Sequence, residues 1–116
     1  MSLMLPILVD NARLIAGAFR SMSVAKGRAE TSAVQRGTVI TLRSSVDGPV
    51  FRITFKVDVR EPRDRYTTEI RDVTNVAFDG SRLIIESDCA RAEYKVVESF
   101  EPCQRCPGTN PTYSIY

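Results

Sequence analysis

The sequence predicts an α+β fold in which an N-terminal helix packs on an antiparallel sheet of five to six strands, arranged as a meander or a partly closed roll. Apolar residues first recur at intervals of three and four, then alternate strictly with polar residues, and turn residues separate several short β-branched segments. A chain of 116 residues with 43% hydrophobic residues is long enough for one core. We therefore expect one domain over residues 1–100 and a C-terminal tail rich in Pro and Cys over residues 101–116.

The predicted helix begins between Pro6 and Asp10 and ends at Lys26, where Gly27 is a natural stop. Its apolar stripe consists of Leu8, Ala12, Ile15, Phe19 and Met22, widened by Leu14 and Ala18. We interpret this helix as the cover of the core, with an exposed dimerisation or membrane-surface helix as the alternative. Its few basic residues give little attraction to lipid. Residues 27–37 have no sustained period and predict an irregular connector from the helix to the sheet.

The clearest strand covers residues 51–59, where apolar and polar side chains alternate without a break. It should form a hairpin with residues 38–43, because Asp47-Gly48 lies between the two segments. Over residues 66–78 the apolar spacing slips near Asp72, which predicts a bulge or a break between two short strands. The pair Asp79-Gly80 then predicts a tight turn, followed by strands over residues 83–85 and 92–96.

Charges of opposite sign are segregated along the chain, although the net charge is only +2. Residues 1–65 carry eleven basic and six acidic groups, whereas residues 66–101 carry four basic and eight acidic groups. These halves could neutralise each other within the fold or between subunits, or the strands could simply expose different charges. The candidates for nucleic-acid binding are the basic residues expected on one sheet face, namely Arg43, Arg52, Lys56 and Arg60. Asp58 interrupts this row, so an ordinary solvated face is the preferred interpretation.

The tail segment Cys103-Gln104-Arg105-Cys106-Pro107-Gly108 resembles one knuckle of a zinc ribbon. A structural zinc site needs four ligands, but the chain has no His and only one further cysteine, Cys89. We expect a disulfide first, either within the Cys103–Cys106 pair or from Cys89 to one of them. Unpaired thiols are the second interpretation, and zinc held by these cysteines is the third. No cofactor is therefore expected, with zinc as the alternative.

Most catalytic classes are disfavoured by the composition. The absence of His rules out Ser-His-Asp and Cys-His catalysis, and the sequence has no glycine-rich phosphate loop. The sequence shows neither a convincing signal peptide nor a membrane-spanning run, so we expect a cytoplasmic protein. The low amide content and the lack of His fit a thermophilic source, and GC-rich coding would explain the many arginines equally well. We expect a small non-enzymatic interaction or assembly module that forms a homo-oligomer, with nucleic-acid binding as the alternative, and neither a membrane nor a small-molecule substrate as partner.

Overall fold

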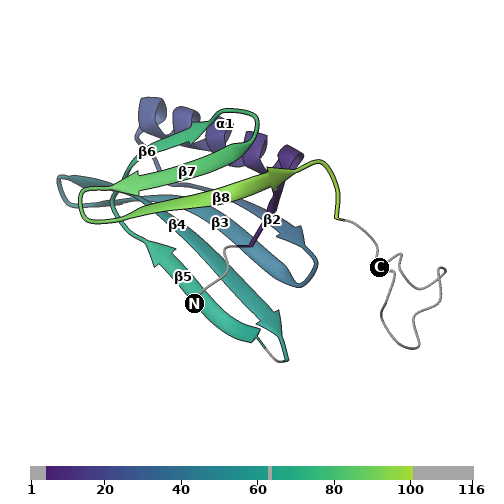
Figure 1. Cartoon of the computed structure of the whole chain (residues 1–116). Coiled ribbons are helices and arrows are strands. Elements are labelled where there is room, and N and C mark those ends of the chain that lie inside the picture. Colours follow the sequence, from purple (N-terminus) through teal and green to yellow (C-terminus); the bar gives the residue numbers. More distant parts are fainter. Residues whose placement is uncertain (1–4, 63, 101–116) are drawn as a thin grey trace, which may run out of the picture.

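One helix and eight strands make up the part of the chain that the computed structural model describes, residues 5–62 and 64–100 (Figure 1). The elements are, in chain order, β1 (Ile7–Leu8), α1 (Val9–Ala25), β2 (Ala29–Gln35), β3 (Thr38–Asp47), β4 (Val50–Glu61), β5 (Asp64–Ile70), β6 (Val73–Phe78), β7 (Arg82–Ser87) and β8 (Arg91–Val97). The strands form two four-stranded sheets, which we call sheet I (order β2-β3-β4-β5) and sheet II (order β1-β8-β7-β6). Together they curl into a half-barrel against which α1 packs.

The predicted α+β class is confirmed, but the predicted number of strands is too low. All neighbouring strands are antiparallel except β1 and β8, which pair in parallel at Ile7–Val96 and Leu8–Val97. A strand of two residues is too short to show a period, so the sequence pattern assigns it to the helix. The slip near Asp72 separates β5 from β6, and a further register shift follows between Val73 and Asn75.

The predicted irregular connector over residues 27–37 is wrong, because most of it forms β2. Only Ala33 and Gln35 are buried in this strand, and neither is a large apolar residue. A strand at the edge of a sheet needs few apolar side chains, so its period-two signal is weak. A turn at Arg36-Gly37, with positive φ values of 46° and 77°, connects β2 to β3.

The predicted helix is confirmed with small changes at both ends. α1 ends at Ala25, and the capping residue Lys26 adopts a left-handed φ of 53° and donates its backbone N–H to the Met22 carbonyl at 2.9 Å. Ala12, Ile15 and Met22 are buried, as the apolar stripe predicts, but Leu14 is 45% exposed. Leu14 lies beyond the edge of the buried stripe, beside β2. Within the described residues, no helix is both long enough and apolar enough to cross a membrane.

The core lies between α1 and the concave faces of both sheets. Strand β4 contributes the alternating residues Ile53, Phe55, Val57 and Val59, as its sequence predicts. The ring of Phe55 meets that of Tyr94 from sheet II edge to face, with centroids 5.7 Å apart and an interplanar angle of 60°. This contact joins the two sheets at their centre.

Candidate interaction surface

The four basic residues predicted as a nucleic-acid face lie on one side of sheet I. Successive side chains of a strand point to opposite faces, so residues spaced four apart share one face. This is the spacing in β4 of Arg52, Lys56 and Arg60. Arg43 lies opposite Thr54 in the β3–β4 register and therefore joins the same face. The sequence pattern thus predicts the arrangement of this row correctly.

Asp58 divides this row near one end. Its carboxylate lies 3.3 Å from the Arg60 guanidinium and 3.8 Å from the Lys56 amine. A 2.6 Å hydrogen bond from Thr67 is the main cause that lowers the pKa of Asp58. Burial opposes this effect without cancelling it, and Arg60 and Lys56 lower the pKa further. Asp58 is therefore ionised near neutral pH, and it offsets part of the positive charge.

Two more carboxylates lie beside Arg52 and Lys56 of this row. Asp72 lies 3.5 Å from the Arg52 guanidinium, and Glu69 is the cross-strand partner of Lys56. A 2.6 Å hydrogen bond from Arg71 is the main cause that lowers the pKa of Glu69. The outer face of sheet I is consequently a mosaic of both signs and not a continuous positive track.

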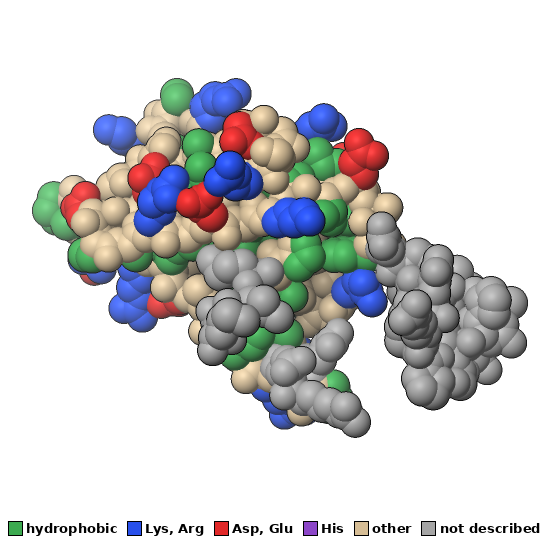
Figure 2. Space-filling model, in the orientation of Figure 1, with side chains coloured by type: hydrophobic (Ala, Val, Ile, Leu, Met, Phe, Trp, Pro, Cys, Tyr) green, Lys and Arg blue, Asp and Glu red, His purple; other side chains and the backbone are tan. Residues whose placement is uncertain are grey.

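The outer face of sheet II is mixed in the same way (Figure 2). Glu93 of β8 lies 2.9 Å from Arg82 of β7 and 2.6 Å from Arg91. Hydrogen bonding to Arg82 is the main cause that lowers the pKa of Glu93, and the charge of Arg91 adds to it. These exposed ion pairs indicate an ordinary solvated sheet face.

The cysteines predicted as a disulfide or metal site are only partly within the described residues. Cys89 is exposed in the turn between β7 and β8, whereas Cys103 and Cys106 lie outside the described residues. From that turn β8 runs to the opposite end of sheet II (Figure 1), over about 20 Å at the usual rise of a strand, and Phe100 follows three residues after its last residue, Val97. Three extended residues beyond Phe100 span only about 11 Å, and a disulfide needs Cα atoms within about 7 Å of each other. This arrangement disfavours a bridge from Cys89 to Cys103. Six extended residues from Phe100 to Cys106 span about 22 Å, so a Cys103–Cys106 ring and a Cys89–Cys106 bridge both stay predictions.

The described residues hold no cluster of three or more side chains that could bind a metal ion. The titratable group most strongly shielded from solvent is the Tyr94 hydroxyl, which has no hydrogen-bond partner among these residues. Burial raises the pKa of Tyr94 to about 12, with a smaller contribution from Tyr66. A phenol with this pKa stays neutral at physiological pH and does not suggest acid–base chemistry.

The contact between α1 and β2 is fixed by a polar clamp at each end. At the first end, the side chain of Gln35, which is 5% exposed, accepts hydrogen bonds from the Leu8 backbone N–H at 3.1 Å and from the Asn11 amide at 2.7 Å. Its own amide donates to the Pro6 carbonyl at 2.8 Å. One buried side chain therefore joins the end of β2 to the beginning of α1.

The second clamp is Ser44 of β3, which is 2% exposed. Its hydroxyl donates to the Gly27 carbonyl at 2.6 Å and accepts from the Ala29 backbone N–H at 3.0 Å. The connector from α1 to β2 is thereby held against sheet I. Since both ends are fixed, the space between helix and strand is set by the side chains in the middle.

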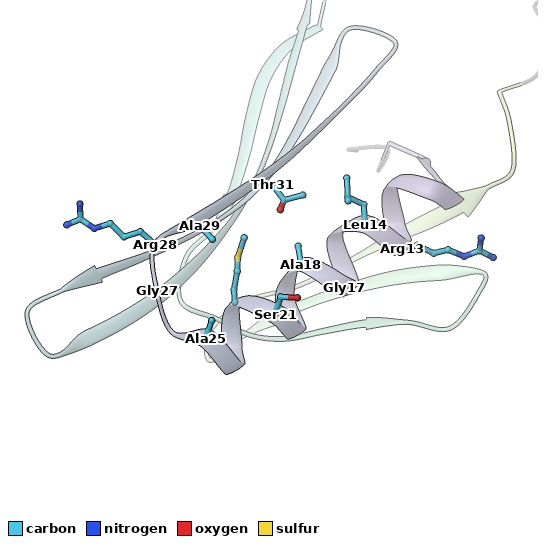
Figure 3. A pocket seen from close by; sticks show the side chains of 11 residues that line it. Arg13, Leu14, Gly17, Ala18, Ser21, Ala25, Gly27, Arg28, Ala29 and Thr31 are labelled. Carbon is cyan, nitrogen blue, oxygen red and sulfur yellow. The ribbon is translucent and has the colours of Figure 1, made fainter.

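These middle side chains are small, and a groove of about 540 Å³ remains between α1 and β2 (Figure 3). Leu14, Ala18 and Thr31 point toward this space, whereas Arg13 and Arg28 extend away from it at its two ends. Its lining comes only from α1, from β2 and from the residues that connect them. The groove therefore opens along the edge of β2 that does not pair with β3.

Gly17 lines this groove from α1, and packing within the chain does not explain why a glycine stands at this position. A Cβ atom built at Gly17 would meet no other atom within 4 Å. Glycine within a helix costs about 1 kcal/mol relative to alanine. The described residues therefore do not require a glycine here, although close approach of another molecule would.

The free edge of β2 is the least protected strand edge of the described chain. The edge strand β1 has only two residues, β6 has a register shift between Val73 and Asn75, and β5 exposes Arg65 and Glu69. In contrast, β2 has no proline and no bulge over Ala29–Gln35, and its one charged residue, Glu30, lies near its beginning. Folded proteins usually block exposed edges with such features, because an open edge can pair with another chain.

Sequence reasoning missed this surface because it assigned residues 27–37 to an irregular connector. The detectable signal was the short pair Arg36-Gly37 after Thr31–Gln35, which resembles a two-residue hairpin turn. The exposed position of Leu14 could not be predicted from the helical period alone. Comparison with known protein families, with curated proteins and with solved structures finds no match to this chain.

Proposed function

We propose that this chain is a small non-enzymatic module that assembles with copies of itself through the free edge of β2 and the adjoining groove along α1. The observation that carries the proposal is the combination of an unprotected strand edge with an apolar groove beside it. Backbone groups on such an edge supply hydrogen bonds to an added strand, and the groove supplies apolar contact area.

Side chains near this edge also favour contact with protein. Val34 of β2 is 72% exposed, and Leu14 lies in the groove with 45% exposure. Neither residue has a role in the core of one chain. Both would lose contact with water if a second chain covered the edge, which stabilises the complex by about 25 cal/mol for each Å² buried.

A matched pair of substitutions tests this function. Val34→Lys places a charge on the proposed interface, whereas Val24→Lys places the same charge on α1 at a residue that is 81% exposed and does not line the groove. Sedimentation velocity over a range of concentrations should show that the natural chain self-associates. The Val34→Lys substitution should weaken association about tenfold or more, because lysine at a strand edge opposes pairing.

Two results would contradict the proposal. The first is a natural chain that sediments as a monomer at every concentration up to about 1 mM, which corresponds to an association free energy weaker than about −4 kcal/mol. The second is an equal effect of the Val34→Lys and Val24→Lys substitutions, since that would indicate a general effect of charge and no defined interface.

Nucleic-acid binding is the second candidate function, because Arg43, Arg52, Lys56 and Arg60 share one exposed sheet face. It predicts binding to DNA or RNA that falls steeply as salt is raised. Substitution of Arg52 and Lys56 by glutamate should then abolish the binding measured at low salt. If no binding appears at low salt, or if the substituted chain binds equally well, this candidate is wrong.

A further inference from the structure

We propose that two copies of the chain pair their β2 strands antiparallel about a two-fold axis at Ala33, so that Glu30 of each copy meets the partner's Arg36. This inference rests on the proposed self-assembly and specifies its geometry. The result would be a continuous eight-stranded sheet in which two equivalent ion pairs set the register.

The β2–β3 hairpin first restricts the registers that β2 can use. In a hairpin with a two-residue turn, the residues that flank the turn, here Gln35 and Thr38, exchange both backbone hydrogen bonds. Because the direction of the backbone groups alternates, Ala33 also faces β3, whereas Ser32 and Val34 direct their N–H and C=O groups to the free edge. An antiparallel partner strand can hydrogen-bond only if its own edge-directed residues lie opposite these.

For two identical strands, this condition places the two-fold axis at a residue and not between two residues, and Ser32 and Ala33 are the most central choices in β2. With the axis at Ser32, Val34 would face the partner's Glu30, and Arg28 would face the partner's Arg36. With the axis at Ala33, Val34 faces the partner's Ser32, and Glu30 lies level with the partner's Arg36, the first turn residue after β2, at both ends of the seam. Like charges directly opposite destabilise a strand pair and opposite charges stabilise it, so the second register is favoured.

Both members of the proposed ion pair are available in one chain. Among the described side chains, neither Glu30 nor Arg36 takes part in a salt bridge, although Arg43 lies opposite Glu30 in the β2–β3 register. The Arg36 guanidinium stacks over the ring of Phe100 at 4.9 Å from its centroid. This contact holds Arg36 at the end of β2, where the partner's Glu30 would arrive.

The same axis explains the groove. Directly opposite residues of antiparallel strands point to the same face, so the two-fold axis is perpendicular to the joined sheet. Both copies of α1 therefore lie on the same face of that sheet. Each groove then opens toward the helix of the other copy. The space at Gly17, which no atom of its own chain fills, allows that helix to approach closely.

Charge reversal tests the register directly. The Glu30→Arg variant would place two like pairs at the seam, and so would the Arg36→Glu variant, so each should self-associate about thirtyfold more weakly than the natural chain. An equimolar mixture of the two variants restores an opposite pair at both ends. Native mass spectrometry of this mixture should therefore show mixed dimers in excess over either homodimer, and the doubly substituted chain should dimerise again. Thermal unfolding of each variant at low concentration identifies any loss of monomer stability.

Other outcomes would overturn this inference while leaving self-assembly intact. Stronger self-association of the Arg36→Glu variant would place the axis at Ser32, where the new carboxylate meets the partner's Arg28. Dimerisation unaffected by either reversal, together with rapid hydrogen exchange of the β2 amides, would place the interface elsewhere. A chain that is monomeric at every concentration contradicts the proposed function itself. If deletion of residues 101–116 then speeds hydrogen exchange of the β2 amides, the tail of the same chain covers this edge.

Discussion

The buried hydroxyl of Tyr94 predicts a substitution that should stabilise the protein. Tyr94 is 2% exposed, and its hydroxyl has no partner among the described residues. A buried polar group without a hydrogen bond costs about 1–3 kcal/mol. The Tyr94→Phe substitution removes this group and keeps the ring that packs on Phe55. We expect the free energy of unfolding at pH 7 to rise by about 1 kcal/mol, the lower end of that range.

The pH dependence of the same substitution gives an independent check. Burial raises the pKa of Tyr94 to about 12 in the folded chain, compared with about 10 for an unfolded tyrosine. A raised pKa means that the folded state holds the Tyr94 proton more tightly than the unfolded state does. The contribution of this proton to the free energy of unfolding is therefore fully present below pH 10 and is lost as pH rises toward 12. At pH 11 the natural chain should have lost about 1 kcal/mol from this group. The advantage of the Tyr94→Phe variant should therefore grow to about 2 kcal/mol at that pH.

Urea unfolding of both chains at pH 7 and pH 11, at concentrations too low for association, measures these differences. The Tyr66→Phe variant is the matched control at pH 7, because Tyr66 is 41% exposed and a surface substitution changes stability by about 0.5 kcal/mol or less. If the Tyr94→Phe variant is less stable than the natural chain by 1 kcal/mol or more, the hydroxyl has a hydrogen-bond partner, and the reasoning fails.

Three further predictions concern the clamp, the groove and the tail. The Gln35→Ala substitution should destabilise the chain by about 2–3 kcal/mol in urea unfolding, because the buried partners at Leu8 and Pro6 lose their hydrogen bonds; a change below about 0.5 kcal/mol would disprove the clamp. The Gly17→Ala substitution should raise monomer stability by about 1 kcal/mol, since its Cβ enters open space; a decrease would show a hidden contact. Native mass spectrometry without reductant should find each chain free of metal and lighter by two hydrogens, the mass change of one disulfide. The Cys89→Ser variant should show the same loss if Cys103 and Cys106 form the ring. Zinc retained by the chain would contradict the predicted disulfide.

The sequence predicts those parts of the fold in which one side of an element is buried and the other is exposed. β4 alternates because Ile53 and Phe55 face the core while Arg52 and Thr54 face solvent. β2 escapes the same reasoning because its inward positions are Ala33 and Gln35, which carry little hydrophobic signal. The burial of Gln35 is explained only by the hydrogen bonds it makes to residues more than twenty positions away.

The candidate site was predicted less well than the fold, and for a related reason. The common face of Arg52 and Lys56 follows from the strand period. The partial neutralisation of their charges does not, because Glu69 is placed by the pairing of β4 with β5, and Asp72 lies in the turn after β5. The groove is also a property of two elements together. The position of Leu14 at its margin depends on how α1 is rotated against β2, and the helical period leaves that rotation open by about one residue.

The parallel pairing of β1 with β8 affects the order in which the chain can fold. Strands β2 to β5 form a meander of sequential hairpins, so sheet I requires only contacts that are close in sequence. Sheet II, in contrast, is complete only when Ile7 meets Val96, near the opposite ends of the described chain. A nascent chain that has emerged as far as Ile70 therefore has every strand of sheet I, while the inner face of α1 still lacks the β6–β8 side of its enclosure. Among the described strands, the last to be synthesised, β8, pairs with the first, β1. Until that pair forms, the apolar side of α1 stays accessible to chaperones and to other unfinished chains.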